Sequence, residues 1–256
     1  MLPDDLATAL TALGERRPDA HLDVRWHARL PSTMDAASAL AHDGAPHGVV
    51  VLADQQTSGR GRRGATWASP PGAGLYLSFI ARPSSPLLSL FTLAAGVAVR
   101  EGIATATGLA ADLKWPNDVI IGRRKLAGIL AEGIAIGSRA QAVIVGVGVN
   151  VQPASYPPDV AARATSLEGE LARAVDRGML LSQIAIALWD RLAMLEYGAG
   201  DILQAWRAAS PNAIGTRVEW EGKSGTTGGI DDSGALLVRT TAGVERILAG
   251  ELRWML

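Results

Sequence analysis

The chain has 256 residues, of which 48% are hydrophobic and 19% are charged, and its formal net charge is −1. A charge so close to zero excludes a general attraction to nucleic acid or to anionic lipid, so any basic site must be local. The sequence has no cysteine, which excludes disulfides, thiolate zinc sites and a cysteine nucleophile, and which fits a cytoplasmic protein.

The segment that precedes the first motif, residues 1–30, shows no sign of targeting. Acidic residues such as Asp4 and Asp5 interrupt it, so it is not a secretory signal. It is shorter than a winged-helix DNA-binding domain, and we therefore expect no DNA binding. No apolar run in the chain reaches the roughly 18–20 residues that a membrane span needs, so we expect no membrane association.

The hydrophobic pattern predicts an α/β chain with a change of character near residue 210. In chain order it predicts helices over 6–13 and 34–42, strands over 49–53 and 75–81, a helix over 86–108, strands over 125–132 and 141–151, and helices over 180–197 and 201–208. Short strands follow at 217–220, 226–230, 236–240 and 245–248, separated by glycine-containing turns. We therefore predict two domains, 1–210 and 211–256, the second a small SH3-like barrel.

Two hydroxyl residues, Ser32 and Thr33, precede the helix predicted over 34–42. Either hydroxyl could cap that helix, and either could bind a ligand. Capping alone accounts for their position, so the pattern leaves both roles open.

A glycine- and arginine-rich loop follows the apolar strand predicted over 49–53. Its core is Gly59-Arg60-Gly61-Arg62-Arg63-Gly64. Glycine lets main-chain N–H groups approach a ligand closely, and the arginine guanidinium matches carboxylate and phosphate oxygens. We predict an anion-binding loop that is mobile when empty and ordered by its ligand. A solvated surface loop and an RNA-binding arginine–glycine segment are the alternatives.

The next motif is the pentapeptide Lys114-Trp115-Pro116-Asn117-Asp118. Pro116 cannot donate a ladder hydrogen bond, so it marks a bulge or the end of a strand. The bend holds a cation, an amide and a carboxylate close together. An ordinary Asn-Asp turn is the alternative.

The two strands that follow carry a lysine and two glycines in unusual places. We expect Lys125 to share a face with Ala127 and Ile129, where it needs an anionic partner or a wet cleft unless it snorkels from the strand end. Gly146 and Gly148 leave one face of the second strand without side chains, which usually admits a ligand or another backbone.

Taken together, the motifs resemble those of one family. Its members share the arginine–glycine loop with Trp67, the segments 114–118 and 125–130, and the glycine strand that ends at Asn150. The chain is similar to biotin protein ligases from residue 31 to its C-terminal end, in a form without the N-terminal DNA-binding repressor domain. The resemblance implies a mixed, largely antiparallel sheet flanked by helices, related to class II aminoacyl-tRNA synthetases. It also implies adenylation of biotin with Mg²⁺ and ATP, and transfer to a lysine of a biotin carboxyl carrier domain.

The chemistry of that first step agrees with the residues. A carboxylate must attack a phosphate, and two unit charges 4 Å apart repel by about 1 kcal/mol in water and by several times more at the edge of a dry site. Nearby cations must offset this repulsion, and the candidates are Arg60, Arg62, Lys114 and Lys125. The substrate carboxylate is itself the nucleophile, so no nucleophilic side chain is needed.

The resemblance also implies roles for individual residues. The catalytic group is Arg60, Arg62, Lys114, Lys125 and Asp118. Biotin is bound by Ser32, Thr33, Gln56, Arg60, Gly61, Arg62, Lys125, Gly128 and Gly148. ATP and the adenylate are bound by Arg62, Arg63, Trp67, Lys114, Asn117, Asp118 and Asn150. Mg²⁺ arrives with ATP near Asp118, and no metal is held by the protein alone. Met34 stands where the family commonly has asparagine, which weakens the case for a biotin contact from that side chain.

The remaining expectations concern partners and rivals. The partner is a biotin carboxyl carrier protein, and the chain is a monomer or a weak homodimer. The four histidines show no metal-ligand spacing and are interpreted as surface residues. A lipoate–protein ligase of the same fold is the nearest rival, although the arginine–glycine loop has the biotin-type pattern. A non-catalytic nucleic-acid-binding regulator is the rival from another class.

Overall fold

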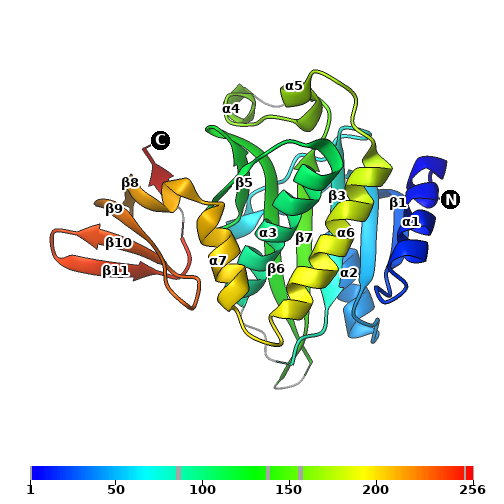
Figure 1. Ribbon diagram of the computed structural model, residues 1–256, viewed down its shortest axis with the longest axis horizontal. Helices are drawn as coiled ribbons and strands as arrows, with labels where there is room; N and C mark the ends of the chain where they lie inside the picture. The colour runs from blue at the N-terminus through cyan, green and yellow to red at the C-terminus, as the bar shows by residue number, and fades with distance from the viewer. Residues whose placement is uncertain (1, 85–87, 137–138, 155–157, 251, 256) are drawn as a thin grey trace.

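Two β-sheets make up the fold (Figure 1). The computed structural model describes the chain except residues 1, 85–87, 137–138, 155–157, 251 and 256. The strands of the larger sheet are β1 (Asp23–Leu30), β2 (Val49–Gln56), β3 (Gly74–Ala81), β4 (Asp112–Lys114), β5 (Asp118–Ile121), β6 (Arg124–Ile136) and β7 (Arg139–Asn150). Their order is β1-β2-β3-β7-β6-β5-β4, with β1 and β2 parallel and the other pairs antiparallel. The prediction of a mixed, largely antiparallel sheet is therefore confirmed.

Strand β1 is absent from the sequence-based prediction, which has no strand before residue 49. It lies at the edge of the sheet, and none of its residues is fully buried. Its sequence, DVRWHARL, mixes charged and apolar residues without a clear period of two. An edge strand needs only weak apolar character, and for this reason the hydrophobic pattern missed it.

Helices cover both faces of this sheet. They are α1 (Asp4–Arg16), α2 (Thr33–His42), α3 (Leu88–Thr107), α4 (Pro158–Ala161), α5 (Leu167–Leu171), α6 (Arg177–Met194) and α7 (Gly200–Ala208). On β2, Val50 and Leu52 point into the main core with α3 and α6, while Val49 and Val51 point toward α2. The strand is thus buried on both faces, as its unbroken apolar run predicts. The start of the predicted helix over 86–108 lies outside the described residues.

Helix α3 is long and apolar enough to span a membrane, which corrects the expectation that no such segment exists. Of its most apolar window, 56% is buried inside the protein, and it packs against α6, α7 and the sheet (Figure 1). A Cβ added to Gly102 would lie 2.8 Å from the Cα atom of Ile184 on α6. Such close helix packing is typical of the central helix of a globular core.

One histidine corrects the expectation of surface positions. His47 packs edge-on against Phe79 and Trp189, with ring centroids 5.3 and 4.7 Å away. Burial lowers the pKa of His47 below its ordinary value of 6.5. Its Nδ1 accepts a hydrogen bond from the main-chain N–H of Arg82, so the ring supports the turn after β3.

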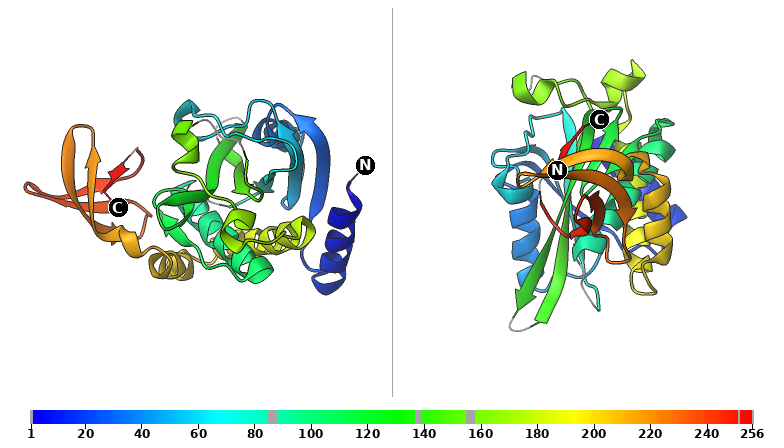
Figure 2. Two further views of the ribbon diagram at one scale, coloured as in Figure 1. Left: turned by 90° about the horizontal axis from the view of Figure 1, so that it is seen from above. Right: turned by 90° about the vertical axis from the view of Figure 1, so that its left-hand side faces the viewer.

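The smaller sheet projects from one side of the larger part (Figure 2). Its strands are β8 (Ile214–Trp220), β9 (Lys223–Ile230), β10 (Leu236–Thr240), β11 (Gly243–Ile247) and β12 (Arg253–Trp254). They are antiparallel, in the order β11-β10-β9-β8-β12. Among the described residues the edge strands β11 and β12 do not pair with each other, so the closed SH3-like barrel stays a prediction. The domain boundary at residue 210 also stays a prediction.

Asp231 organises the turn between β9 and β10. Its carboxylate accepts hydrogen bonds from the main-chain N–H groups of Ser233 and Ala235, at 2.9 and 3.0 Å, and from Nε of Arg246 at 2.6 Å. Burial opposes the charged form, but the hydrogen bonds from Ser233 and Arg246 outweigh it and lower the pKa of Asp231 from 3.8 to about 2. The turn is therefore built around a charged carboxylate.

We expect Asp231→Asn to reduce the free energy of unfolding at pH 7 by about 2 kcal/mol. This value is the lowering of the pKa of Asp231, from 3.8 to about 2, converted to free energy. A carboxyl group whose folded pKa is depressed stabilises the fold above its unfolded pKa, and this contribution is lost as the pH falls through the folded pKa. The difference between wild type and variant should therefore shrink from about pH 4 toward pH 2. Urea unfolding at several pH values measures it, and a difference independent of pH contradicts the assignment.

Candidate active site

One cavity of about 1570 Å³ brings the sequence motifs together. Of the site residues expected from the sequence, its lining includes Thr33, Gln56, Arg60, Gly61, Arg62, Arg63, Trp67, Lys114, Asn117, Asp118, Lys125, Gly128, Gly148 and Asn150. Ser32 is 1% exposed and does not line the cavity, although its Oγ is buried without a hydrogen-bond partner. Segments far apart in sequence thus converge on one volume, for example Thr33 and Asn150, which lie on α2 and β7.

The floor of the cavity is a strip of glycines on β6 and β7. Gly128 pairs directly with Gly148, and Gly146 lies two residues earlier on β7. A Cβ added to Gly148 would lie 2.5 Å from the indole of Trp67, and one added to Gly146 would lie 2.5 Å from Sδ of Met34. The side chains of Trp67 and Met34 occupy the bare face in this structure, so the expectation that it admits a ligand or another backbone stays a prediction.

A β-bulge changes the face on which Lys125 lies. The pairing of β5 with β6 shifts so that Val119 faces Ala127 while Ile120 faces Lys125, which leaves one extra residue on β6. A Cβ added to Gly128 would lie 3.0 Å from Cε of Lys125, so these two residues share a face. The prediction that Lys125 shares a face with Ala127 and Ile129 is wrong, because strict alternation fails at a bulge.

Lys125 has an anionic partner, as expected for a lysine at this position of a strand. Its Nζ lies 2.6 Å from Oδ1 of Asp118 and 5.2 Å from the ring centroid of Trp67. Because both charged groups are largely withdrawn from water, the pair is stronger than one on the open surface. The ion pair links β6 to the bend that begins β5.

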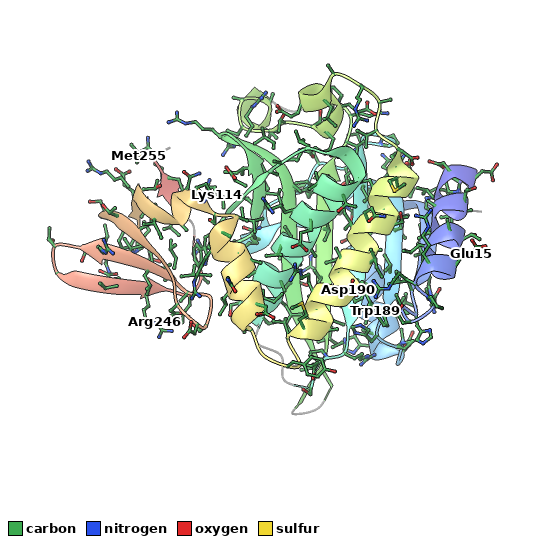
Figure 3. The ribbon with its side chains drawn as sticks, viewed as in Figure 1. Glu15, Lys114, Trp189, Asp190, Arg246 and Met255 are labelled. Atoms are coloured by element: carbon green, nitrogen blue, oxygen red, sulfur yellow. The ribbon has the colours of Figure 1, made fainter. Side chains whose placement is uncertain are left out.

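Lys114 lies on the side of the cavity that faces the smaller sheet (Figure 3). Its Nζ is 5.7 Å from the ring centroid of Trp254 on β12. Burial lowers the pKa of Lys114 below 10.5, and this effect outweighs the attraction of Asp118. A half-buried ammonium group with this environment gains from an added anion.

The arginine–glycine loop folds back on itself. The main-chain N–H of Gly61 donates to the carbonyl of Ala65 at 2.7 Å, and that of Trp67 donates to the carbonyl of Gly59 at 2.9 Å. Arg62 Nη1 donates to Oδ1 of Asn117 at 3.3 Å, so the loop reaches the bend at β5. Whether a ligand orders the loop stays a prediction.

Arg60 is held by two carboxylates. Its guanidinium lies 2.9 Å from Asp35 on α2 and 2.5 Å from Glu132 on β6. Each of the three side chains is about one third or more exposed. A direct contact between Arg60 and a substrate anion, as the resemblance implies, must use the N–H groups that these ion pairs leave or displace one of the carboxylates. In the present geometry Arg60 fastens the loop to α2 and β6.

We expect Arg60→Ala to loosen the loop without unfolding the protein. The ion pairs are partly exposed, so the loss of stability should stay near 1 kcal/mol or below. Limited proteolysis with elastase should cut within residues 57–73 faster in the variant than in the wild type, and biotin with ATP should slow the cleavage of both. Asp35→Asn is the matched variant from the other side of the pair. Equal cleavage rates in all three proteins contradict the fastening role.

A chain of hydrogen bonds crosses the polar end of the cavity. Ser78 Oγ donates to Oγ1 of Thr33 at 2.9 Å, and Thr33 donates through Oγ1 and its main-chain N–H to Oε1 of Gln56, at 3.0 and 2.8 Å. Gln56 Nε2 in turn donates to Oγ of Ser69 at 2.8 Å. Ser32 occupies the N-cap position of α2 but makes no capping hydrogen bond with its side chain. Its buried hydroxyl is therefore a group that a polar ligand can satisfy.

Asn150 closes the other end of the glycine strip. Its Nδ2 donates to the carbonyl of Thr165 at 2.9 Å and to that of Lys125 at 3.3 Å. The side chain thus ties β7 to β6 and to the segment before α5. It lines the cavity, but its amide hydrogens are engaged within the protein.

The described residues contain no group of three or more His, Asp or Glu side chains that could hold a metal ion. Asp118 is a carboxylate that lies among the cations of the cavity. Mg²⁺ usually binds one or two carboxylates together with substrate phosphates, and this oxygen donor fits that chemistry.

The smaller sheet contributes lining residues that the sequence analysis missed. They are Glu219, Trp220, Glu221, Gly222, Lys223 and Ser224, with Leu252, Arg253 and Trp254. Arg163, in the segment before α5, also lines the cavity. No local pattern marks these residues, because only the packing of the second sheet brings them to the site.

Three comparisons with known proteins agree with this geometry. Residues 26–150 match the model of the biotin/lipoate A/B protein ligase family. The chain is 38% identical over 244 residues to the biotin–[acetyl-CoA-carboxylase] ligase of Paracoccus denitrificans, covering 88% of this chain and 98% of the relative. It is 37% identical over 236 residues to the bifunctional ligase/repressor BirA of Bacillus subtilis, and the match covers 89% of this chain and 72% of the relative. The structure of the Aquifex aeolicus biotin protein ligase in complex with biotin and ATP superposes with a TM-score of 0.78 at 28% identity, over 91% of this chain and 98% of that one.

Proposed function

Because the chain belongs to the biotin/lipoate A/B protein ligase family, and within it to the biotin protein ligases, we propose that it adenylates biotin and transfers it to a lysine of a biotin carboxyl carrier protein. The observation that carries the proposal is the convergence of Arg62, Lys114 and Lys125 on one cavity with a bare glycine floor. We place the reaction in the cytoplasm, where ATP is available.

In the first step an oxygen of the biotin carboxylate attacks the α-phosphorus of ATP. The bond from that phosphorus to the bridging oxygen breaks, and pyrophosphate leaves with its electron pair. We assign Lys125 to the carboxylate and Lys114 to the phosphates. Nζ of Lys125 lies 2.6 Å from Oδ1 of Asp118, and the charge of Asp118 also attracts Lys114, so the three groups act on one region of the cavity. Fixed cations of this kind stabilise the charge that develops in the transition state.

The substrates bind at opposite ends of the cavity. The polar end formed by Thr33 and Gln56 suits the ureido ring of biotin, and the glycine strip accepts its hydrocarbon chain when Trp67 moves from the floor. The buried hydroxyl of Ser32, next to Thr33, could reach the ring only if the start of α2 shifts. The adenine end lies toward Trp67 and Asn150. Mg²⁺, when bound with ATP, supplies further positive charge at the phosphates, and Asp118 is the carboxylate that would meet it.

In the second step the neutral amine of the carrier lysine attacks the acyl carbon of the mixed anhydride. An amide bond forms, AMP leaves, and the amine releases a proton. The arginine–glycine loop excludes water from the anhydride while the carrier approaches. A partner with a lysine at an exposed turn fits this requirement.

The test is incubation of the purified chain with biotin, Mg²⁺ and ATP labelled at the α-phosphate. We expect a labelled adenylate on the enzyme, discharge of labelled AMP when a carrier domain is added, and biotin on the carrier lysine. A carrier domain with that lysine replaced by arginine is the control. Lipoate offered in place of biotin tests the rival ligase, and absence of both adenylates contradicts the proposal.

A further inference from the structure

A buried hydrogen bond joins the smaller sheet to the bend that carries Lys114, Asn117 and Asp118, in addition to the contact of Lys114 with Trp254. Trp115 lies inside this bend and is 2% exposed. Its indole Nε1 donates to the carbonyl of Gly234 at 3.0 Å. Gly234 belongs to the turn between β9 and β10 that Asp231 organises. A tryptophan of the larger part is thus held by a turn of the smaller sheet.

The turn is seated on the larger part at two further places. Ser89 Oγ, at the start of α3, donates to the carbonyl of Ser233 at 2.8 Å. Arg207 on α7 donates to the carbonyl of Ile230 at 3.1 Å. The main chain at Gly234 has φ +81°, and a Cβ there would lie 2.8 Å from Cδ1 of Leu93. Only glycine fits this position, so the turn sits directly against α3.

The two ends of the bend differ in how the larger sheet supports them. Asn117 exchanges two hydrogen bonds of 2.9 Å with the main chain of Ile129 on β6, so the end at β5 is held by the larger sheet, whereas the end at β4 has no further strand beside it among the described residues. Strand β4 is three residues long and lies at the edge of the sheet, with β5 as its neighbour. A strand this short at an edge is marginally stable alone. Two contacts replace the missing neighbour: the main-chain N–H of Leu113 donates to the carbonyl of Ala209 at 2.7 Å, and Trp115 donates to Gly234.

We propose that Trp115 is a positioning residue, and that the turn 231–235 sets the place of the bend and thereby the affinity for the nucleotide phosphates. The smaller sheet then acts on the site through Trp115 as well as through the residues that line the cavity. The inference rests on the proposed function for its substrate. It assigns the turn a part in nucleotide binding and none in binding biotin, whose polar end lies at Thr33 and Gln56.

The test compares Trp115→Phe with wild type in the full chain. Phenylalanine keeps an aromatic ring in the core but cannot donate to Gly234. We expect the KM for ATP in biotin-dependent pyrophosphate exchange to rise about tenfold, which corresponds to loss of one hydrogen bond, and the KM for biotin to stay within twofold. A calorimetric titration with ATP alone should show the same weakening, and this readout does not depend on catalysis.

Trp26→Phe is the matched control, because the Nε1 of Trp26 is buried without a hydrogen-bond partner and Trp26 lies on β1, outside the cavity lining. It should leave both KM values unchanged. Ser89→Ala is the second variant, since it removes a hydrogen bond that holds the turn and replaces no residue of the bend. It should weaken the binding of ATP by a few fold.

The outcomes separate this inference from the proposed function. An inactive wild type contradicts the proposed function, whereas an active wild type with the same affinity for ATP in Trp115→Phe and Ser89→Ala overturns the inference. If Tm falls while both KM values stay unchanged, Trp115 is a structural residue only. The same conclusion follows if the affinities for ATP and for biotin fall by the same factor.

Discussion

Replacing Arg62 by alanine should slow biotin adenylation by about 30-fold to 1000-fold, equivalent to 2–4 kcal/mol of transition-state stabilisation. Arg62 lies on the cavity, and its Nη1 donates to Oδ1 of Asn117 at 3.3 Å. It is therefore an arginine of the loop that already reaches the bend 114–118, which we propose binds the nucleotide. When a phosphate or carboxylate binds there, the planar guanidinium can hold two oxygens at once.

Biotin-dependent exchange of labelled pyrophosphate into ATP measures the effect of Arg62→Ala. Arg62→Lys separates charge from shape, because lysine keeps the charge but loses the bidentate fork. Arg25→Ala is the control, since Arg25 pairs with Asp23 on the exposed edge strand β1. An exchange rate unchanged in Arg62→Ala removes Arg62 from the site, and a rate reduced equally in Arg25→Ala points to a general loss of fold.

Local motifs were enough to predict which residues meet at the site. The arginine–glycine loop, the bend 114–118 and the glycine strand all line one cavity: the loop follows the end of β2, the bend joins β4 to β5, and the glycines lie within β6 and β7. The two-face burial of β2 was equally predictable, since a short unbroken apolar run is typical of a strand that is covered on both sides. These features depend on residues close together in sequence.

Features that depend on distant residues were missed. The partners of Arg60 lie 25 and 72 positions away, and no pattern around Arg60 indicates them. The bulge at β6 reverses the face of Lys125, and a bulge has no consistent signature in a strand of small and apolar residues. The lining residues of the smaller sheet likewise depend on how two separate sheets pack.

The ion pairs of the site explain how a cluster of cations remains stable before a substrate binds. Asp118 balances Lys125, while Asp35 and Glu132 balance Arg60. The pairs of Arg60 cost little to separate because their side chains are partly exposed, whereas the less exposed pair of Lys125 with Asp118 separates at small cost only if a substrate anion takes the place of the carboxylate. In the proposed function, the site would exchange these internal anions for the anions of biotin and ATP, which limits the change in net electrostatic energy.

Lys125→Gln tests this exchange most directly. Removal of the ammonium group leaves Asp118, which is about one fifth exposed, without its ion-pair partner and facing the incoming carboxylate, with only the attraction of Lys114 to offset its charge. Truncating one partner of a poorly solvated charge pair costs at least about 2 kcal/mol, so the affinity for biotin should fall about 30-fold, and that for the adenylate by at least as much. The fold should persist, because Nζ of Lys125 contacts the cavity and not the main core.

Calorimetric titration with biotin and thermal unfolding together check this prediction. Arg124→Gln is the matched control on the same strand, since Arg124 pairs with Glu170 outside the cavity lining. It should bind biotin as the wild type does. If Lys125→Gln instead unfolds while Arg124→Gln does not, Lys125 is a structural residue. If Lys125→Gln folds and binds biotin normally, the carboxylate of biotin does not contact Lys125. The substrate anion then does not replace Asp118 as the partner of this lysine.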